Sequence, residues 1–185
     1  MARVITPGKL FDMPDGTRVA PVFNPFEPLS GATAPEPDAD GRMSVALGEL
    51  RAGRSSRIHV LPFVRQITWV LSGPVTMIVK GAADAAPQRL TLLAGQALET
   101  APGDFMQLVN PDRQRPCRML HACTPGYVFH TENGTLRYED AVVFAEDWDA
   151  LAAQNWHPPA LADLDTLQKA RDRAIERITA QARTV

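Results

Sequence analysis

The sequence predicts an all-β domain, a sandwich or barrel of antiparallel strands with an N-terminal arm and a C-terminal helical tail. Three observations predict it: residues 43–129 hold many short β-rich runs between turn residues, the chain before them is dense in proline and glycine, and the chain after them becomes helical in pattern. We divide the 185 residues into an arm at 1–41, a barrel at 42–138 and a tail at 139–185. This length is enough for one domain with a sizeable core and short for two.

The arm is expected to hold little regular structure. Stretches such as DMPDGT and NPFEPLSGATAPEPDADG carry proline and glycine at a density that neither a long helix nor a central strand tolerates. We expect one short strand near RVAPVF, followed by an exposed and partly disordered loop from Ser30 to Gly41.

The barrel strands are predicted to be short and closely spaced. Glycine, proline or Asn/Asp turns separate them, a pattern typical of antiparallel sandwiches and barrels. KGAADAAPQ has the character of a hairpin connection and APGD that of a tight turn. The predicted strands are MSVALGEL, SRIHVLPF, QITWVLSG, VTMIVKG, RLTLLAG, ALETA, FMQLVN and CRMLHACT.

The tail is predicted to contain two helices. EDWDALAAQ begins with acidic residues, which stabilise a helix N-terminus, and WHPP ends that helix. From Ala160 onward, apolar side chains recur on one face of a second helix. They are Leu164, Leu167, Ala174, Ile175 and Ile178. We expect this helix to pack on the outside of the barrel or on a second subunit.

Composition and charge exclude several classes of protein. The net charge is −2 and no basic block is present, so a large nucleic-acid footprint is not expected. No apolar run is long enough for a signal peptide or a membrane span, so we expect no membrane partner. Cys117 and Cys123 stand six residues apart on one predicted strand, too far for a disulfide unless the chain turns between them. Free thiols in the reducing cytoplasm are therefore expected.

Two motifs in the barrel segment resemble those of the cupin superfamily. The first family motif is Gly, five residues, His-x-His, three or four residues, Glu, six residues, Gly. The second is Gly, five residues, Pro-x-Gly, two residues, His, three residues, Asn. The matching positions are Gly53, His59 and Gly73 in the first motif, and Gly95, Gly103 and Asn110 in the second. This resemblance covers about residues 43–127 and implies a jelly-roll, or double-stranded β-helix, that forms a homodimer through an edge strand or the tail.

Of the four places where the family binds metal, only His59 carries the family residue. Leu61 stands at the second histidine, Gln66 at the glutamate and Met106 at the histidine of the second motif. Leucine has no lone pair, methionine offers a soft thioether and glutamine only a neutral oxygen, so this set is a poor site for a hard or borderline divalent ion. We expect no standard cupin metal site and no cofactor.

The predicted strand CRMLHACT offers an alternative set of metal ligands. Its side chains alternate, so Cys117, Met119, His121 and Cys123 share one face. His121 matches an inward histidine in the L-H-x-x-(S/T)-P pattern of some cupin thiol dioxygenases, which implies that His121 and Cys123 lie inside the barrel. His59, Gln66 and His121 would then form a relocated site for one iron, zinc or nickel ion.

Without a metal, three residues are predicted to be catalytic. His59 and His121 are candidates for the general acid and base, because imidazole titrates near neutral pH and the environment tunes it. Gln66 can hold a developing oxyanion without adding a repelling charge. The alternatives are hydrogen-bonded barrel histidines and a buried amide that satisfies the backbone.

Six residues are predicted to bind the substrate: Arg57, Leu61, Met106, Met119, Cys123 and Tyr127. Leu61, Met106 and Met119 would form a dry apolar wall, and dryness strengthens the remaining polar contacts. Arg57 is either an anion-binding group or a solvated charge at the barrel mouth, and Tyr127 would lean over that mouth. Cys123 is a nucleophile only if His121 lowers its pKa, and otherwise fills space.

The favoured function is a metal-independent isomerase, epimerase, cyclase or lyase acting on a small, partly apolar carbonyl metabolite in biosynthesis. Metal-free sugar epimerases and polyketide cyclases are the precedents that the resemblance implies. One alternative is a metal-dependent oxygenase or isomerase that uses the relocated site. The other is a ligand-binding or scaffold cupin without catalysis.

Overall fold

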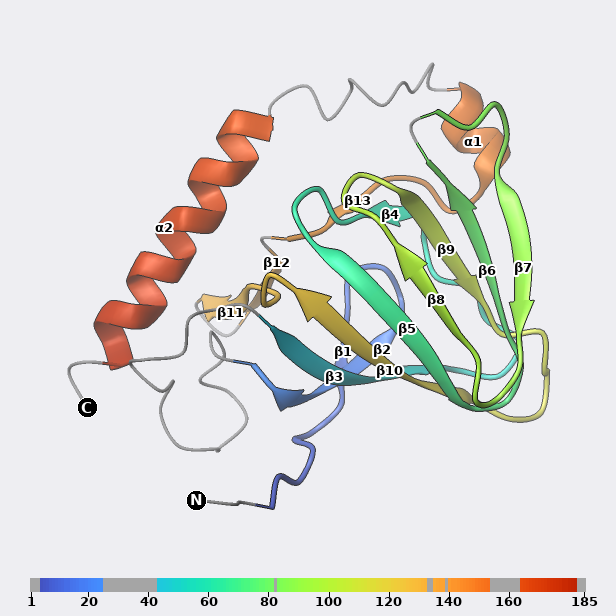
Figure 1. Ribbon diagram of the computed structural model, residues 1–185, viewed down its shortest axis with the longest axis horizontal. Coiled ribbons are helices and arrows are strands. Elements are labelled where there is room, and N and C mark those ends of the chain that lie inside the picture. Colours follow the sequence, from blue (N-terminus) through green and yellow to red (C-terminus); the bar gives the residue numbers. More distant parts are fainter. Residues whose placement is uncertain are drawn as a thin grey trace.

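Two antiparallel sheets enclose one core in the computed structural model, which describes residues 4–24, 43–81, 83–132, 135–138, 140–153 and 164–182 (Figure 1). The predicted all-β class with a C-terminal helical tail is confirmed, and within the described residues both helices follow the strands. The loop expected from Ser30 to Gly41 and the WHPP helix stop lie outside the described residues.

The first sheet has six strands in the order β1-β2-β3-β10-β5-β8. They are β1 (Phe11–Asp12), β2 (Arg18–Phe23), β3 (Ser44–Leu50), β10 (Cys117–Thr124), β5 (Arg65–Ser72) and β8 (Ala97–Thr100). β2 is the predicted RVAPVF strand, and it joins the arm to the barrel by pairing with β3. β10 lies between β3 and β5, so that His121 stands opposite both Ala46 and Thr68.

The second sheet has five strands in the order β13-β4-β9-β6-β7. They are β13 (Val142–Val143), β4 (His59–Val60), β9 (Phe105–Val109), β6 (Val75–Lys80) and β7 (Gln88–Leu92). β11 (Phe129–Glu132) and β12 (Thr135–Tyr138) form a separate hairpin. Strands from distant parts of the chain pair with one another, as in β3 with β10 and β4 with β9, which is the connectivity of a jelly roll.

Alternation along the strands builds the core between the sheets. Leu50, Val70, Met77, Leu108 and Met119 are fully or almost fully buried there. The outward side of β5 is also apolar, because Ile67, Trp69 and Leu71 remain 43%, 50% and 47% exposed. Cys117 and Cys123 are buried free thiols, as expected.

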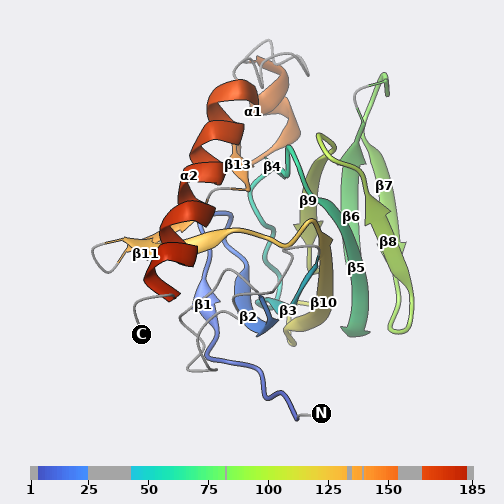
Figure 2. The same cartoon turned by 60° about the vertical axis from the view of Figure 1, so that its left-hand side comes forward.

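Two helices follow the strands. α1 (Trp148–Ala153) packs Leu151 against Ile58 and Phe105 on the outer face of the second sheet. α2 (Leu164–Ala182) lies beside β11, at the opposite side of the molecule from β7 (Figure 2). No helix in the described ranges is long and apolar enough to cross a bilayer.

A buried ion pair and an apolar face attach α2 to the barrel. Ala174 and Ile178 of the predicted apolar face pack on Val128, just after β10. Arg171 donates to Asp140 over 2.6 Å and to the carbonyl oxygen of Gly126 over 2.8 Å. The helix therefore packs on its own barrel, one of the two partners that its pattern predicted.

Candidate functional site

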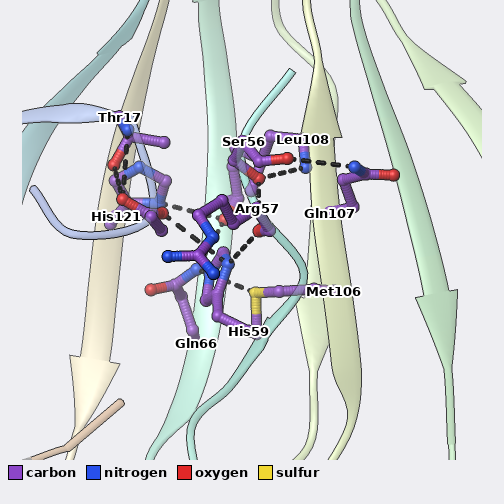
Figure 3. Close-up of polar contacts among 11 residues, drawn as sticks. Thr17, Ser56, Arg57, His59, Gln66, Met106, Gln107, Leu108 and His121 are labelled. Carbon is purple, nitrogen blue, oxygen red and sulfur yellow. Dashed lines mark hydrogen bonds and ion pairs between the residues drawn. The ribbon is translucent and has the colours of Figure 1, made fainter. Parts of the chain in front are cut away.

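Polar side chains from four segments meet between the two sheets. β4 contributes His59, β5 contributes Gln66 and Thr68, β10 contributes His121, and the turn between β1 and β2 contributes Asp15. In Figure 3, His121 lies next to Thr17 of this turn, and His59 lies with Gln66 and Met106. The structure thus brings all three predicted catalytic residues into one interior cluster.

His59 is held through its Nδ1 atom. This atom lies 3.0 Å from the carbonyl oxygen of Arg57 and 3.6 Å from Oδ2 of Asp15, and the side chain is 7% exposed. A carbonyl oxygen can only accept a hydrogen bond, so Nδ1 carries the proton in the neutral ring. The other nitrogen, Nε2, is then unprotonated and available as a base.

Asp15 is a site residue that the sequence analysis did not identify. Its Oδ1 accepts hydrogen bonds from the backbone N–H and the hydroxyl of Thr17, at 3.0 and 2.7 Å, and the residue is 3% exposed. The backbone N–H of Arg57 donates to the carbonyl oxygen of Asp15 over 2.7 Å, which ties the turn to the strand that carries His59. The arm therefore supplies a buried carboxylate to the barrel interior.

His121 is held through a chain of side chains on β5. Gln66 Nε2 donates to the hydroxyl of Thr68 over 3.1 Å, and this hydroxyl lies 3.1 Å from Nδ1 of His121. The Thr68 oxygen accepts from Gln66 and keeps its own proton available to donate to Nδ1 of His121. This donation corresponds to the tautomer of His121 with its proton on Nε2, opposite to that of His59.

The environment keeps His121 neutral at physiological pH. Burial is the largest cause of a lowered His121 pKa, which is about 4; the Asp15 carboxylate opposes this effect and His59 adds a smaller lowering contribution. His121 is thus an uncharged hydrogen-bonding group in this cluster.

The polar atoms of Gln66 all have protein partners. Its Nε2 also lies 3.8 Å from the sulfur of Met106, and its Oε1 accepts from the Cys123 thiol over 3.5 Å. The predicted role of holding an oxyanion remains a prediction. The contacts support a different contribution, in which Gln66 orients Thr68 and, through it, His121.

Of the predicted substrate-binding residues, Arg57 is exposed and the others lie in or against the buried clusters. Leu61, Met106 and Cys123 form one buried cluster against which Tyr127 packs, and Met119 lies in the main core. Arg57 is exposed and donates to the carbonyl oxygen of Phe144 over 3.1 Å, the geometry of a solvated charge rather than of an interior ligand group.

Cys123 does not have the properties of a nucleophile. Burial, reinforced by the charge of Asp140, raises the pKa of this thiol to about 12. The thiolate is the reactive form, so a thiol that stays protonated near neutral pH is unreactive. Of the two predictions for Cys123, the packing role fits the structure.

Comparisons with known proteins identify the fold. No family model and no curated protein matches the chain. Among solved structures, oxalate decarboxylase from Bacillus subtilis is similar at a TM-score of 0.51 and 14% identity, over 72% of this chain and 29% of that chain. The chain has a cupin fold. The fold predicted from the two motifs is thereby confirmed, and identities this low show the fold alone.

Two further cupin-fold structures are similar at lower scores. The Schizosaccharomyces pombe Cnp3 cupin domain has a TM-score of 0.46 and 11% identity, over 63% of this chain and 67% of that one. KdgF from Halomonas sp. has a TM-score of 0.46 and 13% identity, over 63% and 86%.

The metal that cupin proteins commonly hold does not fit these residues. At the four ligand places, Leu61 has no donor atom, and the sulfur of Met106 faces the amide of Gln66. His59 directs Nδ1 to a backbone carbonyl and retains one nitrogen, whereas a catalytic site needs about three protein ligands. Within the described residues, no group of three or more His, Cys, Asp or Glu side chains lies close enough to hold a metal ion, Asp15, His59 and His121 included.

Proposed function

We propose that this chain is a metal-independent cupin-fold enzyme that moves protons on a small, partly apolar carbonyl compound. The reaction class is isomerisation, epimerisation, cyclisation or lyase chemistry, in a biosynthetic role. One observation carries the proposal: two imidazoles from opposite sheets share an interior cluster, and their Nδ1 atoms face different partners, a carbonyl oxygen and a hydroxyl. Enzymes separate an acid from a base by giving two titratable groups different environments.

His59 is the proposed general base. Its Nε2 takes a proton from the carbon next to the carbonyl group, and the electron pair moves onto the carbonyl oxygen. The ring then becomes a cation beside the carboxylate of Asp15, 3.6 Å away, which stabilises that charge. The carbonyl oxygen of Arg57 keeps the ring oriented throughout.

His121 is the proposed oxyanion donor. A neutral imidazole with a proton on Nε2 donates a hydrogen bond to the oxygen on which negative charge develops. Thr68 and Gln66 hold the ring in this tautomer. Return of the proton to a different carbon or face, or departure of a leaving group, gives the alternative products.

The apolar neighbours support the proposed substrate class. Leu61, Met106 and Met119 are buried with almost no exposed surface. They favour a substrate whose body is small and partly apolar, and they strengthen polar contacts by excluding water.

Proton exchange tests this proposal without knowledge of the natural substrate. In D2O, the protein should catalyse loss of α-proton NMR signals from some members of a panel of small ketones, aldehydes and 1,3-dicarbonyls. His59→Asn and His121→Asn should each lower the rate on the order of 10²-fold. Thr76→Val, which removes a side-chain contact with Thr91 away from the cluster, is the matched control and should keep the rate. Prior dialysis against a chelator should also leave the rate unchanged.

A non-catalytic binding or scaffold cupin is the second candidate function. The close packing of the interior favours it, because Leu61, Met106 and Met119 are as buried as an ordinary core. It predicts no exchange with any compound of the panel. It also predicts that His59→Asn and His121→Asn leave the affinity for a bound small molecule nearly unchanged.

We also infer that two copies associate as a homodimer. Ile67, Trp69 and Leu71 form an exposed apolar row on β5, a feature that marks interaction surfaces in soluble proteins. This row lies on the outer face of the sheet, not on the edge strand or tail expected from the sequence. Light scattering should give twice the mass of one chain at micromolar concentration, and Trp69→Ser should lower it toward the monomer.

A further inference from the structure

Gly48 lies at a position in β3 where the backbone conformation does not require glycine. It pairs with Met119 of β10 and Val19 of β2 in the middle of the six-stranded sheet. Unlike Gly16, Gly53, Gly73, Gly95 and Gly103, it does not have a positive φ. Glycine in a strand interior is unfavourable, because it adds no side-chain packing and loses more conformational entropy on folding.

The imidazole of His121 fills the space that a side chain at position 48 would need. A Cβ atom placed on Gly48 would lie 2.2 Å from Nε2, 2.7 Å from Cδ2 and 3.5 Å from Cε1 of this ring. His121 stands directly opposite Ala46, so Gly48 is its diagonal neighbour on the same face. The Nε2–Cδ2 edge of the ring therefore reaches over β3 and occupies the space above the backbone of Gly48.

We propose that Gly48 is a positioning residue for His121, whose missing side chain lets the imidazole lie across β3 while Nδ1 stays on Thr68. The two contacts come from the two strands that flank β10, so they limit the ring from both sides. The placement stands on this geometry alone, whereas its catalytic meaning rests on the proposed function.

A methyl group at position 48 would force the ring to turn about its Cα–Cβ bond. The turn would separate Nδ1 from the Thr68 hydroxyl and free the ring to exchange between tautomers. The titratable groups around the ring are Asp15 from the β1–β2 turn, His59 from β4 and Cys123 on its own strand. None of them holds Nδ1 in place of Thr68.

A double-mutant cycle tests the steric part of the proposal. Gly48→Ala should lower the folding equilibrium constant at least tenfold in the native chain, because the methyl group and the ring compete for the same space. In a His121→Ala background the same substitution should leave the constant unchanged or raise it. Equal effects in the two backgrounds would overturn the proposal. If Gly48→Ala alone does not fold, folding of the double variant supports the proposal and its failure to fold overturns it.

The ¹⁵N spectrum of the His121 ring tests the positioning part. In the native chain the two ring nitrogens should give the widely separated signals of a single tautomer with the proton on Nε2. Gly48→Ala should move these signals toward the average of two tautomers, whereas unchanged signals would contradict the proposal. Gly81→Ala is the matched control, since Gly81 also lacks a positive φ and the atoms nearest to its Cβ position belong to the side chains of Asp84 and Asp104.

These readouts use no substrate. A protein that exchanges no protons can therefore still support the role of Gly48, and that result would count against the proposed function alone. Conversely, normal ring signals in the Gly48→Ala variant would overturn the role of Gly48 even if proton exchange succeeds.

Discussion

The two imidazoles of the barrel interior have the same chemistry and opposite surroundings. His59 stands on the five-stranded sheet, with Nδ1 facing a carbonyl oxygen and the carboxylate of Asp15. His121 stands on the six-stranded sheet, with Nδ1 facing a hydroxyl and its ring lying on Gly48. The first ring lies beside a carboxylate, whereas burial lowers the pKa of the second to about 4.

This difference underlies the proposed division of roles between the two imidazoles. A carboxylate beside an imidazole stabilises the protonated ring, whereas burial beside a neutral hydroxyl disfavours it. The sequence positions of the histidines do not carry this difference. It comes from groups on other segments, namely the arm for His59 and the strands β3 and β5 for His121.

The largest expected effect is on stability at acid pH. The pKa of His121 is about 4 in the folded chain and 6.5 in an unfolded one. As the pH falls from 6.5 to 4, the unfolded state takes up a proton that the folded state does not, so the free energy of unfolding decreases in this window and levels off below it. The decrease attributable to this residue is on the order of 3 kcal/mol at most, reduced by the partial exposure of the ring.

Urea unfolding between pH 7 and pH 4 measures this effect. The loss should be markedly smaller in His121→Asn, because asparagine offers an acceptor near the Nδ1 position but takes up no proton. If the free energy of unfolding falls by the same amount with pH in the native chain and in the variant, the environment of His121 does not disfavour the charged ring. A native-state NMR titration of this ring with a midpoint near 6.5 would show the same.

The fold was predictable because its signals are local and repeated. The short strands follow from β-rich runs between turn residues, and Gly73, Gly95 and Gly103 of the two motifs all lie at positions with a positive φ. Alternation placed His121 and Cys123 on one face of β10, and the resemblance to the family pattern indicated that this face points inward. Periodicity of this kind needs no knowledge of distant partners.

The partners of the two histidines were not predictable in the same way. Asp15 lies in DMPDGT, a stretch that indicates a turn and nothing more until the arm is seen pairing with the barrel. Gly48 was one of many glycines, and only its distance to the ring of His121 distinguishes it. The hydrogen bond of Arg57 to Phe144 and the contacts of the Gln66 amide with Met106 and Cys123 likewise depend on segments far along the chain.

Removing the negative charge of Asp15 is expected to have a smaller effect, and this effect should differ between the two imidazoles. Asp15→Asn keeps a side chain that can accept from Thr17 but removes the carboxylate from the neighbourhood of both rings. Proton exchange should fall about tenfold, equivalent to about 1.4 kcal/mol, because the His59 cation loses its counter-charge. The pKa of His121 should fall below its value in the native chain, since Asp15 raises it.

Thr17→Val is the matched control for Asp15→Asn. It removes the hydroxyl that donates to Oδ1 of Asp15 but leaves the carboxylate charge and the backbone N–H in place. Its effect on exchange and on the pKa of His121 should therefore be smaller than that of Asp15→Asn. If the two variants behave alike, Asp15 acts by fixing the turn rather than by its charge. The contrast between the two imidazoles would then come from their hydrogen bonds alone.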